Sequence, residues 1–164
     1  MTDIIEKIDL KPMNWQLGDV AMSRTNFYMI YNDPSEGITV HWNNKFTNES
    51  DKRHNFSSRD DAKSWIKDVH AKGIQCRYDA LARETGLDIG QRWAHKRQPK
   101  IIIEILMMDE KTVYTKAYNE LQVDTGAPVE NDLLILQHYL AEHFVLMLDG
   151  ETIEQALTRC EAAA

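Results

Sequence analysis

The sequence has little of several features that usually identify a protein's class. It contains two cysteines, Cys76 and Cys160, in 164 residues, too few for the disulfide framework of a small secreted domain. Its longest apolar run, 101–108, is interrupted by Glu104 and is much shorter than the roughly 20 residues that cross a bilayer. The first residues include acids where a secretory signal carries basic residues. We therefore expect a cytoplasmic protein without a membrane segment, whose two thiols are reduced and buried.

Motifs that bind nucleotides or metals are also missing. The seven glycines are scattered and form neither GxxxxGKS/T nor GxGxxG, which argues against the phosphate-binding loops of those two classes. No GxSxG nucleophile motif occurs. His138 and His143 lie five residues apart, whereas a helical zinc motif needs a spacing of four so that both rings share a face. These absences favour a non-enzymatic protein with no cofactor, no metal site and no catalytic residue.

An enzyme whose site is assembled from distant parts of the chain is an alternative. Its candidate residues are His41, His138 and Glu142, of which the last two share a face of a predicted helix. Asp60 and Asp61 are adjacent carboxylates, but they lie in the first turn of another predicted helix, where the helix dipole favours acids. That position explains the two aspartates without an acid–base role.

Length and composition favour a single domain, residues 1–164, with 43% hydrophobic and 27% charged residues. The net charge of −7 is unevenly distributed along it. Residues 1–44 have a net charge of −3, residues 45–100 carry 13 Lys and Arg against 8 Asp and Glu, and residues 101–164 carry 3 against 12. A basic middle and an acidic C-terminal third are therefore two candidate binding regions.

Residues 1–72 predict a small antiparallel sheet of two or three strands with a helix packed on it. A short amphipathic helix ended by Pro12 is expected first. The expected strands and connections are 15–22, 26–32 and 38–42, with turn residues at 33–37 and an exposed loop at 43–55. Ser57 or Ser58 can cap the helix that follows, and Gly73 ends it.

Residues 73–164 predict a mainly helical half. The expected helices are 74–84, 89–96, 112–121, 128–148 and a last helix that carries residues 153–160. Apolar residues surround much of the helix at 128–148, which predicts that it is central. Residues 101–108 fit a buried strand or a buried helical turn. The predicted fold class is therefore α+β, a small N-terminal sheet with a packed helix followed by a mainly helical C-terminal half.

The segment FSSRDDAKSW at 56–65 has the form of a strand-to-helix junction between Phe56 and Trp65. It resembles the junction of DNA-reading domains with a three-stranded sheet and a helix, such as integrase arm-binding domains. The longer region 10–72, which contains this junction, resembles small uncharacterised phage and prophage accessory proteins. The second resemblance implies a phage or mobile-element accessory factor that acts in the cytoplasm of a host cell. The predicted strand faces carry almost no Lys or Arg, which disfavours DNA reading by the sheet.

Residues 78–87 resemble the first half of a bacterial helix-turn-helix, because Ala82 and Gly86 have the spacing of its packing alanine and turn glycine. Positions 92 and 95, where apolar residues should seat the second helix, are Arg92 and His95. A DNA-binding regulator that uses the basic region 45–97 is accordingly the second candidate function. Its DNA contacts are assigned to Arg83, Arg92, Lys96 and Arg97.

The acidic C-terminal third is the favoured partner surface. It contains twelve acids and only three cations, so its negative electrostatic field attracts basic patches on other proteins. The candidate partner-binding residues are Glu130, Asp132, Glu142, Asp149, Glu151 and Glu154. We expect a non-enzymatic protein that binds and inhibits a host defence or nucleic-acid-processing protein through this surface. The opposed charges within one chain are also consistent with a homodimer.

Overall fold

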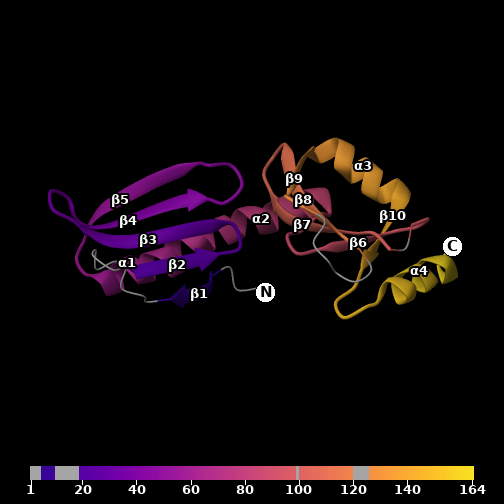
Figure 1. Cartoon of the computed structure of the whole chain (residues 1–164), viewed down its shortest axis with the longest axis horizontal. Coiled ribbons are helices and arrows are strands. Elements are labelled where there is room, and N and C mark those ends of the chain that lie inside the picture. Colours follow the sequence, from indigo (N-terminus) through magenta and orange to yellow (C-terminus); the bar gives the residue numbers. More distant parts are fainter. Residues whose placement is uncertain (1–4, 10–18, 99, 120–125) are drawn as a thin grey trace. The chain divides into compact units, whose positions relative to one another are not determined.

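The computed structural model describes residues 5–9, 19–98, 100–119 and 126–164. The chain divides into two compact units, an N-terminal unit, Met1–Arg77, and a C-terminal unit, Tyr78–Ala164. Figure 1 follows the chain through both. The division lies close to the expected border between the sheet-containing and helical halves, at residue 72, whereas the single-domain organisation stays a prediction.

The N-terminal unit contains a five-stranded antiparallel sheet in the order β1-β2-β3-β4-β5. Its strands are β1 (Ile5–Asp9), β2 (Asp19–Ser23), β3 (Asn26–Asp33), β4 (Gly37–Asn44) and β5 (Ser50–Phe56). The predicted strands at 26–32 and 38–42 and the turn between them are confirmed, with Asp33 paired to Gly37. β2 covers the second half of the predicted strand at 15–22, and residues 15–18 lie outside the described residues.

Two segments of this sheet were predicted wrongly. Residues 5–9 pair with β2 as a strand, where a short helix was expected; Pro12 lies outside the described residues. The expected loop at 43–55 contains β5, which pairs with β4. β5 reads SDKRHNF and is mostly exposed. Charged side chains protect an edge strand from pairing with other chains, so this strand lacks the apolar alternation that would have revealed it.

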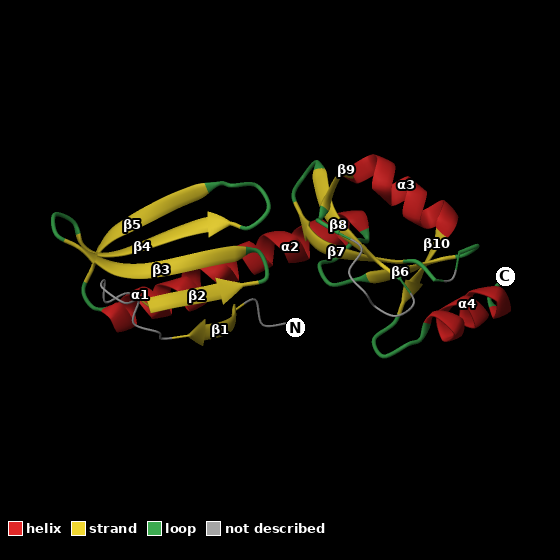
Figure 2. Ribbon diagram, in the orientation of Figure 1, coloured by secondary structure: helices red, strands yellow, loops and turns green. Residues whose placement is uncertain are grey.

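One continuous helical segment lies against one face of this sheet (Figure 2). It consists of α1 (Arg59–Trp65), the π-helical turn η1 (Ile66–Ala71) and the start of α2 (Lys72–Thr85). Ser58 caps it, since its Oγ accepts a hydrogen bond from the Asp61 amide at 3.0 Å. The expected end at Gly73 is wrong, because the helix continues to Thr85. The core between helix and sheet contains Ala21, Tyr28, Ile30, Val40, Ala62 and Ile66.

The C-terminal unit is not mainly helical, which corrects the expected fold. It contains a second five-stranded antiparallel sheet in the order β10-β6-β7-β8-β9. Its strands are β6 (Arg92–His95), β7 (Ile102–Met108), β8 (Thr112–Tyr118), β9 (Val129–Asp132) and β10 (Phe144–Met147). The helices expected at 89–96 and 112–121 are therefore wrong, and the open alternative at 101–108 is settled as a strand. The chain remains α+β.

Two helices follow the strands of this unit. The helix expected at 128–148 is reduced to α3 (Leu133–His143), because its two ends form the edge strands β9 and β10. Leu133, Leu136 and Leu140 of α3 pack on the sheet in a core with Ile105, Met108, Val113 and Phe144. The last helix is confirmed as α4 (Ile153–Ala162), which begins with a Thr152–Gln155 capping box and lies against β10 and β6.

The structure also bears on the expected lack of a membrane segment and on the two cysteines. No helix within the described ranges is long and apolar enough to cross a membrane. Neither cysteine is in a disulfide, but Cys76 is exposed and Cys160 is half-buried, so the expectation of two buried thiols is wrong.

Candidate functional site

The outward side of α3 exposes large apolar residues. Leu134 is 66% exposed, Ile135 70% and Tyr139 44%. At about 3.6 residues per turn, His138 and Glu142 share this side, and the buried Leu133, Leu136 and Leu140 occupy the opposite one. We call Leu134, Ile135, His138, Tyr139 and Glu142 the α3 outer face.

The two ends of α3 are anchored by polar contacts. At the first turn, the Asp132 carboxylate accepts from the Ile135 amide at 3.1 Å, and the Leu133 amide donates to the Lys111 carbonyl at 2.8 Å. At the last turn, Lys96 Nζ donates to the carbonyls of Ala141 and Glu142, at 3.2 and 3.0 Å. These carbonyls lack partners within the helix, so the lysine caps the C-terminus. The outer face is thus held in one orientation on its sheet.

Aromatic side chains gather at the C-terminal end of the outer face. The Tyr139 ring centroid lies 4.9 Å from that of His143 and 5.5 Å from that of Phe144. His95 of β6 stacks on His143, with centroids 6.3 Å apart and planes 12° apart. Edge-to-face and stacked rings at these distances stabilise each other. Tyr139 is therefore a rigid, partly exposed aromatic group, of the kind enriched in protein interfaces.

The six predicted partner-binding acids lie in the C-terminal unit but do different things. Glu130, Glu142, Asp149 and Glu154 are exposed. Asp132 is exposed and also caps α3. Glu151 binds Arg159 through a 2.9 Å contact and accepts from the Leu148 amide at 2.8 Å. The hydrogen bond from Arg159 is the main reason that the pKa of Glu151 is lowered. Glu151 therefore has a structural partner. Only Glu142 lies on the α3 outer face.

The division into units changes how the charge of the chain is distributed. Residues 1–77 carry 11 Lys and Arg and 11 Asp and Glu, a net charge of zero. Residues 78–164 carry 8 against 15, so the whole net charge of −7 belongs to the C-terminal unit. The basic middle of the sequence is split between the units. The acidic character is thus a property of the unit that carries the α3 outer face.

The four residues assigned to DNA occupy different elements. Arg83 lies on α2 and donates to the Asp79 carbonyl at 3.3 Å, and the Arg92 guanidinium on β6 lies 5.9 Å from the Tyr118 ring centroid. Lys96 caps α3, and Arg97 is exposed in the turn after β6. Gly86 does end α2, with φ +74°. The second helix of the expected helix-turn-helix is wrong, because β6 occupies its place. The assignment of these residues to DNA stays a prediction.

The three candidates for a distributed enzyme site are divided between the two units. His41 lies on β4, and His138 and Glu142 lie on α3. Across the part of the chain that the structure describes, no group of three His, Cys, Asp or Glu residues could hold a metal ion.

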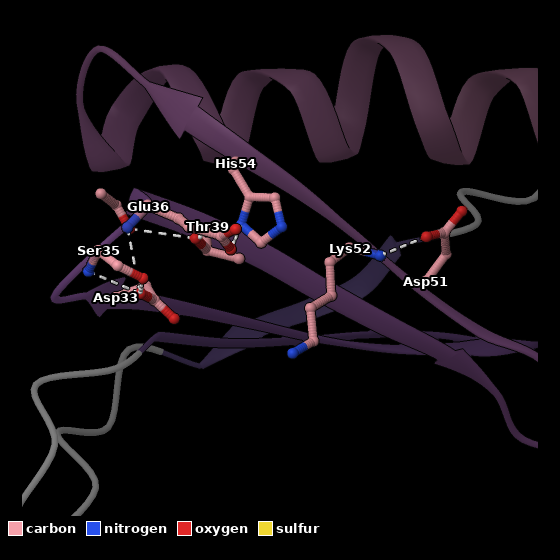
Figure 3. A network of polar contacts seen from close by, with 8 residues as sticks. Asp33, Ser35, Glu36, Thr39, Asp51, Lys52 and His54 are labelled. Carbon is pink, nitrogen blue, oxygen red and sulfur yellow. Dashed lines mark hydrogen bonds and ion pairs between the residues drawn. The ribbon is translucent and has the colours of Figure 1, made fainter.

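A polar network in the N-terminal unit brings a histidine, a carboxylate and a hydroxyl together (Figure 3). His54 Nδ1 lies 2.8 Å from Glu36 Oε2 and 3.0 Å from Thr39 Oγ1. Both contacts use the same ring nitrogen, whereas a hydrolase triad sets a different partner on each nitrogen. Asp33 Oδ1 meanwhile accepts from the Ser35 and Glu36 amides, at 2.9 and 3.1 Å. The network therefore ties the β3–β4 turn to β5 as a structural unit.

The N-terminal unit also contains an aromatic cluster that the sequence did not predict. The π-helical turn η1 carries His70, whose Nδ1 lies 2.8 Å from the hydroxyl of the buried Tyr28. The His70 ring centroid lies 4.6 Å from that of Trp42 and 5.2 Å from that of Trp65. Burial lowers the pKa of His70, Arg77 lowers it further, and Asp51 opposes this. Single π-helical turns often occur at functional sites. The sequence of residues 66–71 contains no pattern that predicts a π-helical turn.

Comparison with known proteins identified no relative: no family model, no curated protein and no solved structure matches the chain.

Proposed function

We propose that the C-terminal unit is a non-enzymatic protein-binding module that uses the α3 outer face to bind a basic protein. The observation that carries the proposal is the exposure of Leu134 and Ile135, 66% and 70%, on a helix whose other side forms the core of the unit. An exposed apolar group on a well-anchored element, beside polar residues, is typical of a binding surface.

Burial of this face would supply the attraction. Covering one Leu or Ile side chain completely is worth about 1.5–3 kcal/mol, and Tyr139 adds a rigid aromatic group of the type found at binding hot spots. The anchored ends of α3 mean that little conformational entropy is lost when the partner binds.

Charge selects the kind of partner. Two copies of the C-terminal unit each carry −7, so an α3-to-α3 homodimer would bring like charges together. A partner with an excess of Lys and Arg gains from the same field, which raises its local concentration and its association rate. We therefore propose a basic foreign protein and not a second copy. Inhibition of a host defence or nucleic-acid-processing protein is the specific form that the phage-protein resemblance implies, and it stays a prediction.

The test is partner capture with an α3 variant. A tagged chain is expressed in its native host, the co-purifying proteins are identified, and binding is reconstituted with each purified protein. Leu134→Asp together with Ile135→Asp should abolish binding of one basic protein. Val69→Asp is the matched control, because Val69 is 57% exposed in the N-terminal unit and its replacement should leave binding unchanged.

Circular dichroism must show that both variants are folded. Equal capture by the wild type and the α3 variant would contradict the proposal, and so would a partner that is acidic or a second copy of the chain.

A further inference from the structure

A second surface, in the N-terminal unit, combines a cation with aromatic rings. The guanidinium carbon of Arg53 on β5 lies 5.0 Å from the ring centroids of both Phe56 and Trp65. Phe56 and Trp65 are themselves 5.5 Å apart, and Trp42 lies 5.4 Å from Trp65. We call Arg53, Phe56, Trp65, Trp42 and His70 the Arg53 cluster. Arg53 is exposed, and the other four side chains are half-buried.

Among the described residues, the Arg53 side chain is held by stacking on Phe56 and Trp65. Its side chain forms no ion pair and no hydrogen bond with any residue in the described ranges. A guanidinium held over rings keeps its planar fork of N–H donors, and less rotamer entropy is lost when those donors bind a planar or tetrahedral anion. The side chain is therefore prepared to bind an oxyanion beside an aromatic surface.

His70 extends the cluster along the helix. The Nδ1 of its ring lies 2.8 Å from the Tyr28 hydroxyl. Two charges act on this ring, from Asp51 on β5 and Arg77 on α2. Arg77 has the larger effect of the two, so the charges around His70 do not oppose an anion bound to the Arg53 guanidinium.

We propose that the Arg53 cluster binds single-stranded nucleic acid, with a phosphate on the Arg53 guanidinium and a base against its aromatic side chains. Cation-and-ring surfaces bind single strands in this way, because every base has a face that can stack and every nucleotide carries a phosphate. The inference concerns a different unit from the α3 outer face and does not depend on it.

The charges favour nucleic acid over a peptide. The N-terminal unit has a net charge of zero, so it does not repel a polyanion as the C-terminal unit does. A proline-rich peptide would use the rings and gain nothing from the guanidinium. An acidic peptide would use the guanidinium and gain little from the rings. A nucleotide strand uses both.

The experiment is a titration of the full chain with a short oligothymidylate strand at low ionic strength, followed by tryptophan fluorescence and by fluorescence anisotropy of the labelled strand. We expect quenching of tryptophan emission and an anisotropy rise that weakens as salt increases. Arg53→Ala should weaken binding about tenfold or more, since both a phosphate contact and a stacking partner are lost. Arg53→Lys should restore only part of it, because a point charge does not stack.

Lys111→Ala is the control, since Lys111 is an exposed cation within the C-terminal unit that has no assigned binding role, and this variant should bind like the wild type. Arg53→Ala must keep the wild-type circular dichroism spectrum and melting temperature. The proposal is overturned by an absence of binding by the wild type, by equal binding of Arg53→Ala, or by equal affinity for the same sequence in a duplex. Quenching by a proline-rich peptide without binding of the oligonucleotide would overturn it in favour of a peptide site.

Discussion

His70 shows how the fold constrains a single ionisable side chain. The residue belongs to a π-helical turn, and its ring packs beside Trp42 and Trp65 while its Nδ1 meets the Tyr28 hydroxyl. Burial disfavours the charged imidazolium and lowers its pKa, and Arg77 acts in the same direction. The neutral ring is therefore the form that the folded unit accommodates.

This arrangement predicts that acid destabilises the N-terminal unit through His70. The folded-state pKa lies below the value of about 6.5 of an unfolded histidine. The unfolded chain therefore binds more protons between the two values, and the free energy of unfolding falls as the pH drops through that interval. His70→Gln should reduce this fall. Urea unfolding followed by tryptophan emission, at about pH 7.5 and about pH 5.5, measures it.

His138→Gln is the control for the histidine prediction, because His138 is exposed on α3. It should keep the pH dependence of the wild type. An unchanged pH dependence in His70→Gln would show that the buried ring does not couple to folding.

Some properties of the proposed binding residues could be predicted from the sequence, and others could not. The acidic count of the C-terminal third is evident from the sequence, but the Arg159 partner of Glu151 and the capping role of Asp132 depend on local geometry. The exposure of Leu134 and Ile135 could not be predicted, since both read as core residues of a central helix. Arg53 was read as part of an exposed loop, so its stacking on Phe56 and Trp65 was missed.

At the scale of elements, the start of α1 is a point where the sequence left two alternatives. Either Ser57 or Ser58 could cap the helix, and the structure assigns the cap to Ser58 through its 3.0 Å bond from the Asp61 amide. The aspartates at 60 and 61 lie in the first turn as expected.

Ser58→Ala should therefore destabilise the N-terminal unit by about 1 kcal/mol, since one helix amide loses its acceptor. Ser57→Ala is the matched control, and because Ser57 is exposed outside the helix its effect should stay within about 0.5 kcal/mol. Urea denaturation midpoints compare the two. Equal effects of both substitutions would show that the cap is not specific to Ser58.

Helix and strand were confused where short apolar runs had two compatible periods. Residues 112–118 place Val113 and Tyr114 next to each other and Ala117 and Tyr118 four residues later, which fits a helix. The same segment alternates as a strand, with Val113 and Thr115 buried. Its pairing with β7 and β9 decides between them. The pattern within 112–118 does not include these partners, so it cannot decide between helix and strand.

At the scale of the whole molecule, the unit boundary changes the meaning of the charge distribution. Counted along the chain, the charge separates a basic middle from an acidic end. Counted by unit, it separates a neutral unit from one that carries −7. The proposed functions follow this division, since a basic protein suits the charged unit and a nucleic acid strand suits the neutral one.

The division predicts how salt and mutation act on binding of the basic partner. Rising salt screens the field of the C-terminal unit, so the association rate should fall while the dissociation rate changes little. Leu134→Asp should instead raise the dissociation rate, because it removes an apolar contact of the bound state. Surface plasmon resonance with the purified partner separates the two rates. A dissociation rate that follows salt and an association rate that does not would contradict this account.

The sequence by itself determined the α+β class, the hairpin around 33–37, a helix capped by Ser57 or Ser58, the last helix and the absence of common nucleotide motifs. Each of these depends on neighbouring residues, through turn chemistry, capping or apolar periodicity. The tertiary structure alone decided that the C-terminal half is built on a sheet, that α3 exposes Leu134 and Ile135, and that Arg53 stacks on Phe56 and Trp65. These features depend on which strands pair and which faces pack, and a local apolar pattern does not specify those partners.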